Sequence, residues 1–477
     1  MKRNAPEPVQ HPASFRDPSG FIVRAGTMYY RQVDQAGAQD YEQLMRSGLY
    51  DRLIARKLLI PHTEVDEDLT GSAKRYKTLL PRQLPFISYP SEWSPDQLRD
   101  IALHSLDVLE LALDHGMILK DASPMNVQFD GGAPVFIDTL SFTSYDETRP
   151  WVAYRQFCEC CLFPLYLHRY AGDGVHRIFA AYPAGIPAAV TARLLPAKSR
   201  LSSGVWMHVL LQSKIRSDGE PGGRTLSFSK EKLLRLVHHL RHIIKQMNLV
   251  GRAGTAWSGY YGEGQAMSGD GYLKAKEKLF LELTGEIEAA TWLDLGANDG
   301  HFTRLLAGRL PAGKGKRIVA VDADWLCIDR LYLATRKAGK AREDAGDPTI
   351  FPLCVDLCEP TPAGGFRNEE RAAFSDRARS EAVVALALVH HLALGRSIPL
   401  AGIAQYFAEL TESWLIVEFV PLTDERAHAL IRNKALWHIP YDRAAFESAF
   451  GNAFLIERCE IIPGTERILY RMKKKNA

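Results

Sequence analysis

The chain has 477 residues, of which 46% are hydrophobic and 24% are charged, and its formal net charge is +3. This length exceeds what one hydrophobic core usually covers, so length and composition predict a globular protein of two domains. A net charge this small gives no reason to expect nucleic acid or an anionic membrane as a partner.

The first residues, 1–15, are polar and are expected to be disordered. They lack the apolar core of a secretory signal. The longest apolar run, AVVALALVHHLAL at residues 382–394, is interrupted by two histidines and is too short to span a bilayer. We therefore expect a cytoplasmic protein without a membrane span.

The first predicted elements are two strands joined by a turn at Gly26, in DPSGFIVRAGTMYYRQV. Residues 38–60 follow with the periodicity of an amphipathic helix. A proline-broken extended stretch, KTLLPRQLPFISYP, leads to a long helix over residues 94–116. Ser94 is the predicted N-cap of that helix, and Pro95 suits its first turn.

The region from 151 to 250 is predicted to be mainly helical, with a loop at DGEPGG. Within it, Cys158, Cys160 and Cys161 form a cluster. No pair of CxxC motifs accompanies the cluster, so buried, reduced cysteines are favoured over a zinc site, and no metal site is predicted. Residues 251–285 are rich in glycine, serine and aromatic residues, which predicts a connector that could act as a lid.

From Thr291 onward, strands alternate with helices, which predicts a parallel sheet covered by helices on both faces. The chain ends with two further strand patterns, FLIERCEII and RILYRM. Because PGTE separates them, they are predicted to form a closing hairpin. The predicted fold class of this half is α/β. The predicted parallel strands are TWLDLG, RIVAVDAD, IFPLCVDL, AVVALALV and WLIVEFV.

The strand TWLDLG runs into a glycine-rich turn, ANDGHF. Gly296 and Gly300 allow the backbone to approach a ligand closely, because they have no Cβ. Asp294 lies in the strand that leads to this turn. Asp322 ends the next strand, where a carboxylate can accept hydrogen bonds from both hydroxyls of a ribose. Asp356 ends the following strand and is placed to accept from an adenine amino group.

This pattern resembles class I S-adenosylmethionine-dependent methyltransferases, and the resemblance covers about residues 286–477. DLGANDG resembles the first motif of that family, with Asn298 where a glycine is commonest. The resemblance implies S-adenosylmethionine as cofactor and a Rossmann-like seven-stranded sheet whose last strand is reversed. The competing dehydrogenase interpretation requires G-x-G-x-x-G, whereas this chain has GANDG. The implied cofactor-binding residues are Asp294, Gly296, Ala297, Asn298, Gly300, Asp322, Asp356 and Ala387.

The strand AVVALALV resembles the segment that faces cofactor and acceptor in this family. His390 and His391 stand at its exit, and either could act as general base, since an unperturbed imidazole has a pKa of about 6.5. Glu418, near the end of WLIVEFV, is the alternative base. The plainer interpretation is a strand end with one hydrogen-bonded and one solvated histidine.

The acceptor is predicted to be a small molecule or a glycan. Amino-methylating enzymes of nucleic acids resemble one another in an Asn/Asp-Pro-Pro-Tyr motif, which is absent here. Cytosine C5 enzymes need a cysteine after a proline, and no Pro-Cys pair occurs. The pattern of the whole chain, including ALVHHLALGRSIP, resembles bacterial nodulation-type or glycan-modifying methyltransferases. No nucleic-acid partner is therefore expected.

Upstream, the stretch LKDASPMN and the later FID resemble the catalytic and metal-binding loops of the protein-kinase-like superfamily, which includes aminoglycoside phosphotransferases. The resemblance implies an α+β kinase-like domain over residues 16–250. It also implies that Asp121 is a base and that Asn126 and Asp138 are magnesium ligands beside ATP.

This part of the chain departs from the kinase pattern in several places. No His-Arg precedes Asp121, and Thr-Leu follows Asp138. Arg31 is nearest to the expected lysine, with Glu42 as its predicted partner, and arginine does not simply replace lysine. Three interpretations stay open: an ordinary turn, a kinase-like fold without phosphoryl transfer, and a working phosphotransferase.

The sequence therefore predicts a methyltransferase whose N-terminal half selects or holds the acceptor. A bifunctional kinase–methyltransferase is the first alternative. A non-enzymatic binding protein on a methyltransferase fold is the second.

Overall fold

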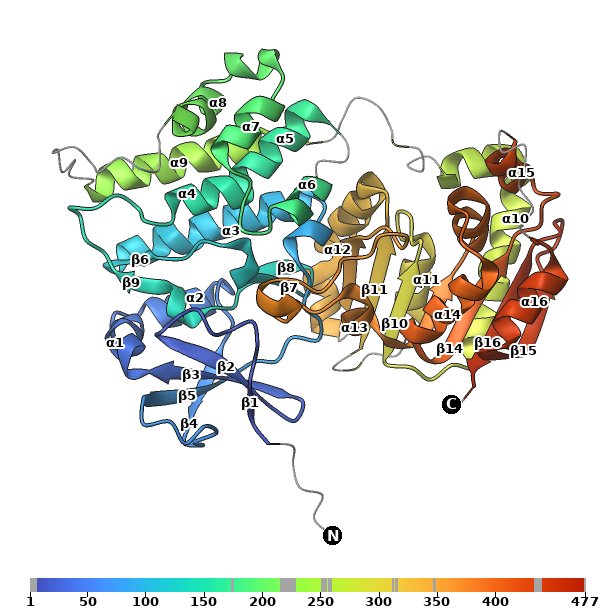
Figure 1. Cartoon of the computed structure of the whole chain (residues 1–477), viewed down its shortest axis with the longest axis horizontal. Helices are drawn as coiled ribbons and strands as arrows, with labels where there is room; N and C mark the ends of the chain where they lie inside the picture. The colour runs from blue at the N-terminus through green and yellow to red at the C-terminus, as the bar shows by residue number, and fades with distance from the viewer. Residues whose placement is uncertain are drawn as a thin grey trace, which may run out of the picture. The chain divides into compact units, whose positions relative to one another are not determined.

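The computed structural model describes residues 7–172, 176–214, 229–249, 255, 260–310, 313, 316–345, 349–432 and 440–475. The chain divides into two compact units, and Figure 1 labels most of their elements. Unit 1 comprises residues 1–251 and 363–372, and unit 2 comprises residues 252–362 and 373–477.

Unit 1 begins with a five-stranded antiparallel sheet in the order β1-β2-β3-β5-β4. β2 and β3 form the predicted hairpin, with Ile22 opposite Arg31. Val9 and Gln10 pair with β2, so the expectation of disorder is wrong for this part of the N-terminal segment. The strands are β1 Val9–Gln10, β2 Gly20–Ala25, β3 Met28–Asp34, β4 His62–Val65 and β5 Arg75–Pro81.

Two helices, α1 (Ala38–Arg46) and α2 (Leu49–Ala55), replace the single helix expected for this segment. The break lies at Gly48, whose φ of 74° is in the left-handed region that glycine adopts without strain. Tyr41 of α1 packs with Val33 of the sheet in one small core cluster.

The long helix α3 (Pro95–Asp114) begins where it was predicted to begin. The Ser94 hydroxyl accepts the N–H of Gln97 at 3.4 Å, and the Gln97 side chain accepts the N–H of Ser94 at 2.8 Å. This reciprocal cap satisfies two backbone donors at the helix start. Two small antiparallel ladders follow, β6 with β9 and β7 with β8. Their strands are β6 Met117–Leu119, β7 Val127–Asp130, β8 Ala133–Phe136 and β9 Phe142–Ser144.

The rest of unit 1 is mainly helical within its described residues, as predicted. The expected DGEPGG loop falls in residues 215–228, outside the described part. Cys158, Cys160 and Cys161 are buried, as expected for that cluster. The helices are α4 Tyr154–Phe157, α5 Phe163–Ala171, α6 His176–Ala181, α7 Ala188–Leu194, α8 Ser203–Val205 and α9 Lys230–Gln246.

A short segment from the C-terminal half of the sequence, residues 363–372, also belongs to unit 1. Glu370 forms an ion pair with Arg16. The backbone N–H of Ala372 donates to the hydroxyl of Tyr89 at 3.0 Å. These contacts account for its assignment to that unit.

Unit 2 is an α/β fold around a mixed sheet, as the predicted fold class requires. Its strand order is β12-β11-β10-β13-β14-β16-β15. The pairs among β10 to β14 are parallel, whereas β16 runs antiparallel to both β14 and β15. The strands are β10 Thr291–Leu295, β11 Arg317–Asp322, β12 Thr349–Cys354, β13 Ser380–Ala385, β14 Thr411–Phe419, β15 Phe454–Ile461 and β16 Ile468–Lys474.

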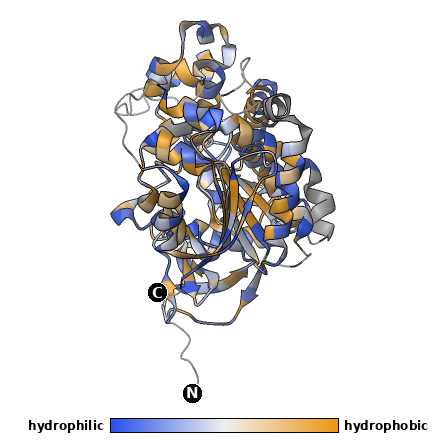
Figure 2. Ribbon diagram, turned by 90° about the vertical axis from the view of Figure 1, so that its right-hand side faces the viewer, coloured by the Kyte–Doolittle hydropathy of each residue, from blue (hydrophilic) through white to orange (hydrophobic). Residues whose placement is uncertain are grey.

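Helices pack against this sheet, and one of them was not expected. Residues 260–285, predicted as part of a connector, form α10, whose Phe280 and Leu283 are fully buried against the strands. The apolar strands are buried on both faces, which explains their nearly continuous hydrophobic runs (Figure 2). The helices are α10 Tyr260–Gly285, α11 His301–Arg309, α12 Trp325–Ala345, α13 Phe374–Ala378, α14 Leu400–Leu410, α15 Glu425–Ile431 and α16 Arg443–Gly451.

Within the described ranges, no helix combines the length and the apolarity needed to cross a membrane.

Candidate functional site

A cavity of about 330 Å³ lies in unit 2, where β10, β11, β12 and β13 end. The carboxyl ends of parallel strands are where open α/β sheets bind ligands. Most of the residues predicted for a cofactor site meet around this cavity. Those that line it are Asp294, Gly296, Ala297, Asn298, Asp322, Asp356 and Ala387. His391, one of the predicted bases, lines it as well.

The glycine turn after β10 takes the left-handed conformation at three positions. The φ angles are 73° at Gly296, 51° at Asn298 and 79° at Gly300. Asparagine adopts this region more readily than most side chains, so Asn298 is compatible with the turn. A Cβ at Gly300 would lie 2.3 Å from Leu331 of α12, so this glycine allows close packing and does not line the cavity.

Two carboxylates, the buried Asp294 and the half-buried Asp322, stand at the ends of neighbouring strands. The Thr303 hydroxyl donates to Asp294 at 2.6 Å. Asp322 accepts the backbone N–H of Asn298 at 2.8 Å and that of Asp324 at 2.9 Å. Burial raises the pKa of each carboxyl to about 6, although these hydrogen bonds act in the opposite direction. Both groups therefore gain from ligands that donate hydrogen bonds or carry positive charge.

The third predicted carboxylate, Asp356, already has partners in the protein. One oxygen is 3.0 Å from the guanidinium of Arg396, and the other accepts the backbone N–H of Cys358 at 3.0 Å. Arg396 also lines the cavity, so a hydrogen-bond donor, Arg396, and an acceptor, Asp356, lie side by side in its wall.

The two histidines after β13 differ in position. His391 lines the cavity, whereas His390 does not and is almost completely buried. The expectation of an imidazole that titrates near 6.5 is not met. Burial lowers the pKa of His391 to about 4, with Arg467 and Arg426 adding to the shift. Burial also lowers the pKa of His390, and His391 adds to that shift.

Glu418, the alternative base, does not line the cavity. Its carboxylate lies 2.6 Å from the Lys276 ammonium and 3.4 Å from the Arg467 guanidinium. Burial alone would raise the pKa of Glu418, but these two cations outweigh it and hold the pKa below its usual range. A fully buried, paired carboxylate of this kind is a poor proton acceptor, so the predicted role is not supported by its contacts.

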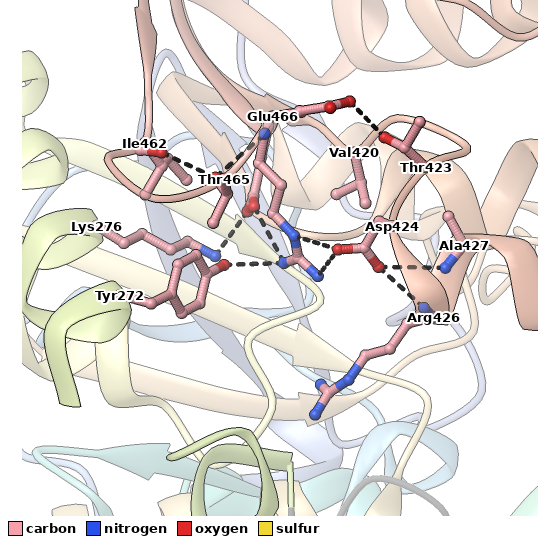
Figure 3. A network of polar contacts seen from close by, with 12 residues as sticks. Tyr272, Lys276, Val420, Thr423, Asp424, Arg426, Ala427, Ile462, Thr465 and Glu466 are labelled. Carbon is pink, nitrogen blue, oxygen red and sulfur yellow. Dashed lines mark hydrogen bonds and ion pairs between the residues drawn. The ribbon is translucent and has the colours of Figure 1, made fainter. Parts of the chain in front are cut away.

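Glu418 belongs to a wider network of buried polar contacts, drawn in Figure 3. Arg467 also contacts Asp424 at 2.8 Å and the hydroxyl of Tyr272 at 2.9 Å. Tyr272 and Lys276 both come from α10 and point into this network (Figure 3), where Tyr272 contacts Arg467 and Lys276 contacts Glu418. The network therefore joins α10 to the ends of the sheet beside the cavity.

Lys276 is the main cavity residue that sequence analysis missed. It is almost completely buried, its ammonium lies 5.1 Å from the centroid of the Phe302 ring, and its charge lowers the pKa of Asp294. One signal could have found it. Lys276 precedes Phe280 by four residues and Leu283 by seven, which places it on the apolar face of a helix.

In unit 1, two of the three candidate nucleotide-site residues, Asn126 and Asp138, are connected through hydrogen bonds to Ser141. Asp138 forms an ion pair with Arg31 at 2.9 Å, so the predicted pairing of Arg31 with Glu42 is wrong. The Ser141 hydroxyl donates to Asp138 and accepts from the Asn126 amide at 3.2 Å.

Asp121 is placed differently from those two residues. It accepts the backbone N–H of Ser123 at 2.8 Å, which is the ordinary turn contact. Among the residues that the structure describes, no cluster of three or more metal-ligating side chains is present.

Comparisons with known proteins place methyltransferases among the structural neighbours. No family model matches the chain. Nodulation protein NoeA of Rhizobium meliloti strain 1021 is 29% identical, over 98% of this chain and 97% of that protein.

Solved structures match parts of the chain, and two of them serve as examples. A proposed O-methyltransferase from Nostoc punctiforme PCC 73102 is 19% identical over 45% of this chain and 59% of that one, with a TM-score of 0.32. The 16S rRNA methylase ArmA is 17% identical over 47% of this chain and 100% of that one, with a TM-score of 0.29.

Proposed function

We propose that unit 2 transfers a methyl group from S-adenosylmethionine to a small-molecule or glycan-type acceptor. One observation carries the proposal: Asp294, Asp322 and Asp356, from three successive strand ends, stand around a single cavity beside the glycine turn. A nucleoside joined to an amino acid presents ribose hydroxyls, a base amino group and a charged end. These groups can donate hydrogen bonds to the three carboxylates around the cavity.

We propose a partner among the cavity residues for each part of the cofactor. Asp322 would accept the ribose hydroxyls, and Asp356 would accept the adenine amino group beside Arg396. Lys276 and Asp294 offer an ammonium and a carboxylate to the zwitterionic amino-acid end, and charge-assisted hydrogen bonds of this kind are the strong ones. The raised pKa of Asp294 and of Asp322 supports this assignment, because bound donors would stabilise their ionised forms.

When bound, the cofactor supplies a methyl group activated by its sulfonium. The protein's own contribution is to hold the acceptor in line and to take up the proton that the acceptor loses. His391 is the residue we propose for that proton, because its imidazole lines the cavity and is neutral at pH 7. Glu418 instead positions Lys276, and the backbone N–H of Ala387 is a further donor to it.

For unit 1 we propose a role in selecting or holding the acceptor, in preference to phosphoryl transfer. The carboxylate of Asp138 is already neutralised by Arg31, and its other oxygen is engaged by Ser141. A magnesium ion would have to displace that guanidinium. A bifunctional kinase–methyltransferase with ATP and magnesium at Asp121, Asn126 and Asp138 is therefore the weaker proposal.

The test is calorimetric titration of the full chain with S-adenosylhomocysteine. The variant Asp322→Asn is expected to bind about ten-fold or more weakly, since hydrogen bonds to charged groups contribute about 1.5–3 kcal/mol. Affinity for the native chain should fall as the pH drops below about 6, where Asp322 takes up its proton. Asp376→Asn, an exposed aspartate of unit 2 outside the cavity, is the matched control.

Turnover is then followed with methyl-labelled S-adenosylmethionine and oligosaccharide or small-molecule acceptors. Ribosomal RNA is included as the opposing acceptor class. Absence of S-adenosylhomocysteine binding would favour a non-enzymatic protein, and labelled RNA alone would overturn the acceptor proposal.

A further inference from the structure

A group of exposed apolar side chains lies on the helical part of unit 1, around α7 and α8. Leu201 is 92% exposed and Trp206 is 53% exposed, and both are large side chains that usually seek burial. Trp206 and Met207 are consecutive and exposed, and Leu211 follows about one turn later, while Val205 and Val209 are fully buried. We call the group of Leu194, Leu201, Trp206, Met207 and Leu211 the α7–α8 surface.

Four exposed cations are interleaved with these apolar residues: Arg193, Lys198, Arg200 and Lys214. Residues 178–214 contain no aspartate and no glutamate, and within the described part of the chain none of the four cations has an ion-pair partner.

The neighbouring helix α9 shows the contrast. There, Arg241 contacts Asp107 at 2.9 Å and Lys230 contacts Asp114 at 3.1 Å. The formal net charge of +3 for the whole chain therefore conceals a local excess of positive charge around α7 and α8.

We propose that the α7–α8 surface docks on an anionic lipid bilayer. Leucine and tryptophan side chains that protrude beside lysine and arginine are typical of segments that lie in the membrane interface. The cations gain from anionic headgroups within a Debye length of the bilayer, and the apolar side chains enter the boundary between headgroups and acyl chains. Each contribution is modest, so attachment requires both.

A protein partner matches this surface less well than a bilayer does. Tryptophan, methionine and arginine are common at protein–protein interfaces, but lysine is depleted there, and Lys198 and Lys214 belong to this surface. Leu201 also protrudes almost completely, and a protruding side chain suits insertion into a fluid layer. The attachment is peripheral, and it is independent of the proposed methyl transfer.

The test is co-sedimentation of the full chain with phosphatidylcholine vesicles, with and without phosphatidylglycerol. Binding is expected only with phosphatidylglycerol and should weaken as salt is added. Leu201→Ser/Trp206→Ser and Lys198→Glu/Arg200→Glu are each expected to reduce vesicle binding at least about ten-fold. Because these side chains are exposed, both variants should melt at the native temperature.

The controls are Leu455→Ser and Arg56→Glu, which remove an exposed leucine and an exposed arginine elsewhere in the chain. They should bind vesicles as the native chain does. Equal binding to neutral vesicles, or no binding to either kind, would overturn the proposal. So would a dimer in light scattering that Leu201→Ser/Trp206→Ser dissociates, because the surface would then be an interface between two copies of the chain.

Discussion

The ammonium of Lys276 lies 2.6 Å from the carboxylate of Glu418, and both side chains are almost completely buried. This pair connects α10 to β14 beside the cavity, and Arg467 adds a second cation to the same carboxylate. Glu418 therefore has a structural role as the shared partner of two cations, although its place at the end of a strand had suggested a catalytic base.

Removing one member of this buried pair should destabilise unit 2 strongly. Glu418→Gln is expected to lower the free energy of unfolding by about 3–5 kcal/mol, because an uncompensated buried charge remains. Lys276→Met should cost less, since Arg467 still faces the carboxylate. Urea denaturation of both variants measures the difference.

The exposed pair of Lys278 and Glu282 on the same helix serves as the control. Lys278→Met should change stability by less than about 1 kcal/mol, as surface ion pairs do. An equal loss for Lys278→Met and Lys276→Met would mean that burial of the pair contributes nothing.

Asp294 is expected to destabilise the ligand-free protein at neutral pH. Its pKa of about 6 in the folded state lies above that of an unfolded aspartate. Between about pH 4 and pH 6 the unfolded chain loses this proton first, so the free energy of unfolding falls as the pH rises and stays low above that window. Asp294→Asn should therefore raise stability at pH 7.5 by up to about 3 kcal/mol, while weakening S-adenosylhomocysteine binding.

Denaturation midpoints at pH 4 and pH 7.5 give the comparison for Asp294→Asn. The amide can still accept the hydrogen bond from the Thr303 hydroxyl, so the local structure should persist. A variant that is less stable than the native chain at both pH values would refute the assignment of a raised pKa.

His391 is expected to act as a base without a pH break near 6.5. Its pKa of about 4 keeps the imidazole neutral, so kcat at saturating cofactor should stay level between about pH 6.5 and pH 8, above the range where Asp322 takes up its proton. His391→Ala should lower kcat about 100-fold, the lower end of what general base catalysis contributes, because a base with a pKa of about 4 is a weak proton acceptor. His428→Ala, an exposed histidine of α15, is the control. If kcat is unchanged in His391→Ala, His391 is not the base, and the proton lost by the acceptor passes to solvent.

ATP with magnesium is expected to leave the melting temperature of the full chain unchanged. Ligands that bind only the native state raise that temperature by mass action. Here the ion pair of Arg31 with Asp138 occupies the carboxylate that a metal would need. A saturable rise that disappears in Asp138→Asn would contradict this and revive the phosphotransferase interpretation.

Much of the local structure follows from the sequence alone. Ser94 and Pro95 mark the start of α3, and the alternation of apolar strands with helices predicts the α/β sheet of unit 2. The glycine turn from Asp294 to Gly300 is equally local, because backbone conformation and the end of one strand define it. Such features depend on neighbours a few residues away, so periodicity and capping residues are enough to predict them.

Tertiary structure decided the features that depend on distant partners. Lys276 became a cavity residue because α10 packs against the sheet, and Glu418 lost its expected role because two cations from other elements reach it. The pKa of His391 fell because several segments bury the ring. Arg31 forms an ion pair with Asp138, which lies more than a hundred residues away in the sequence. Burial and charge depend on how the whole chain packs, and no short stretch of sequence contains that information.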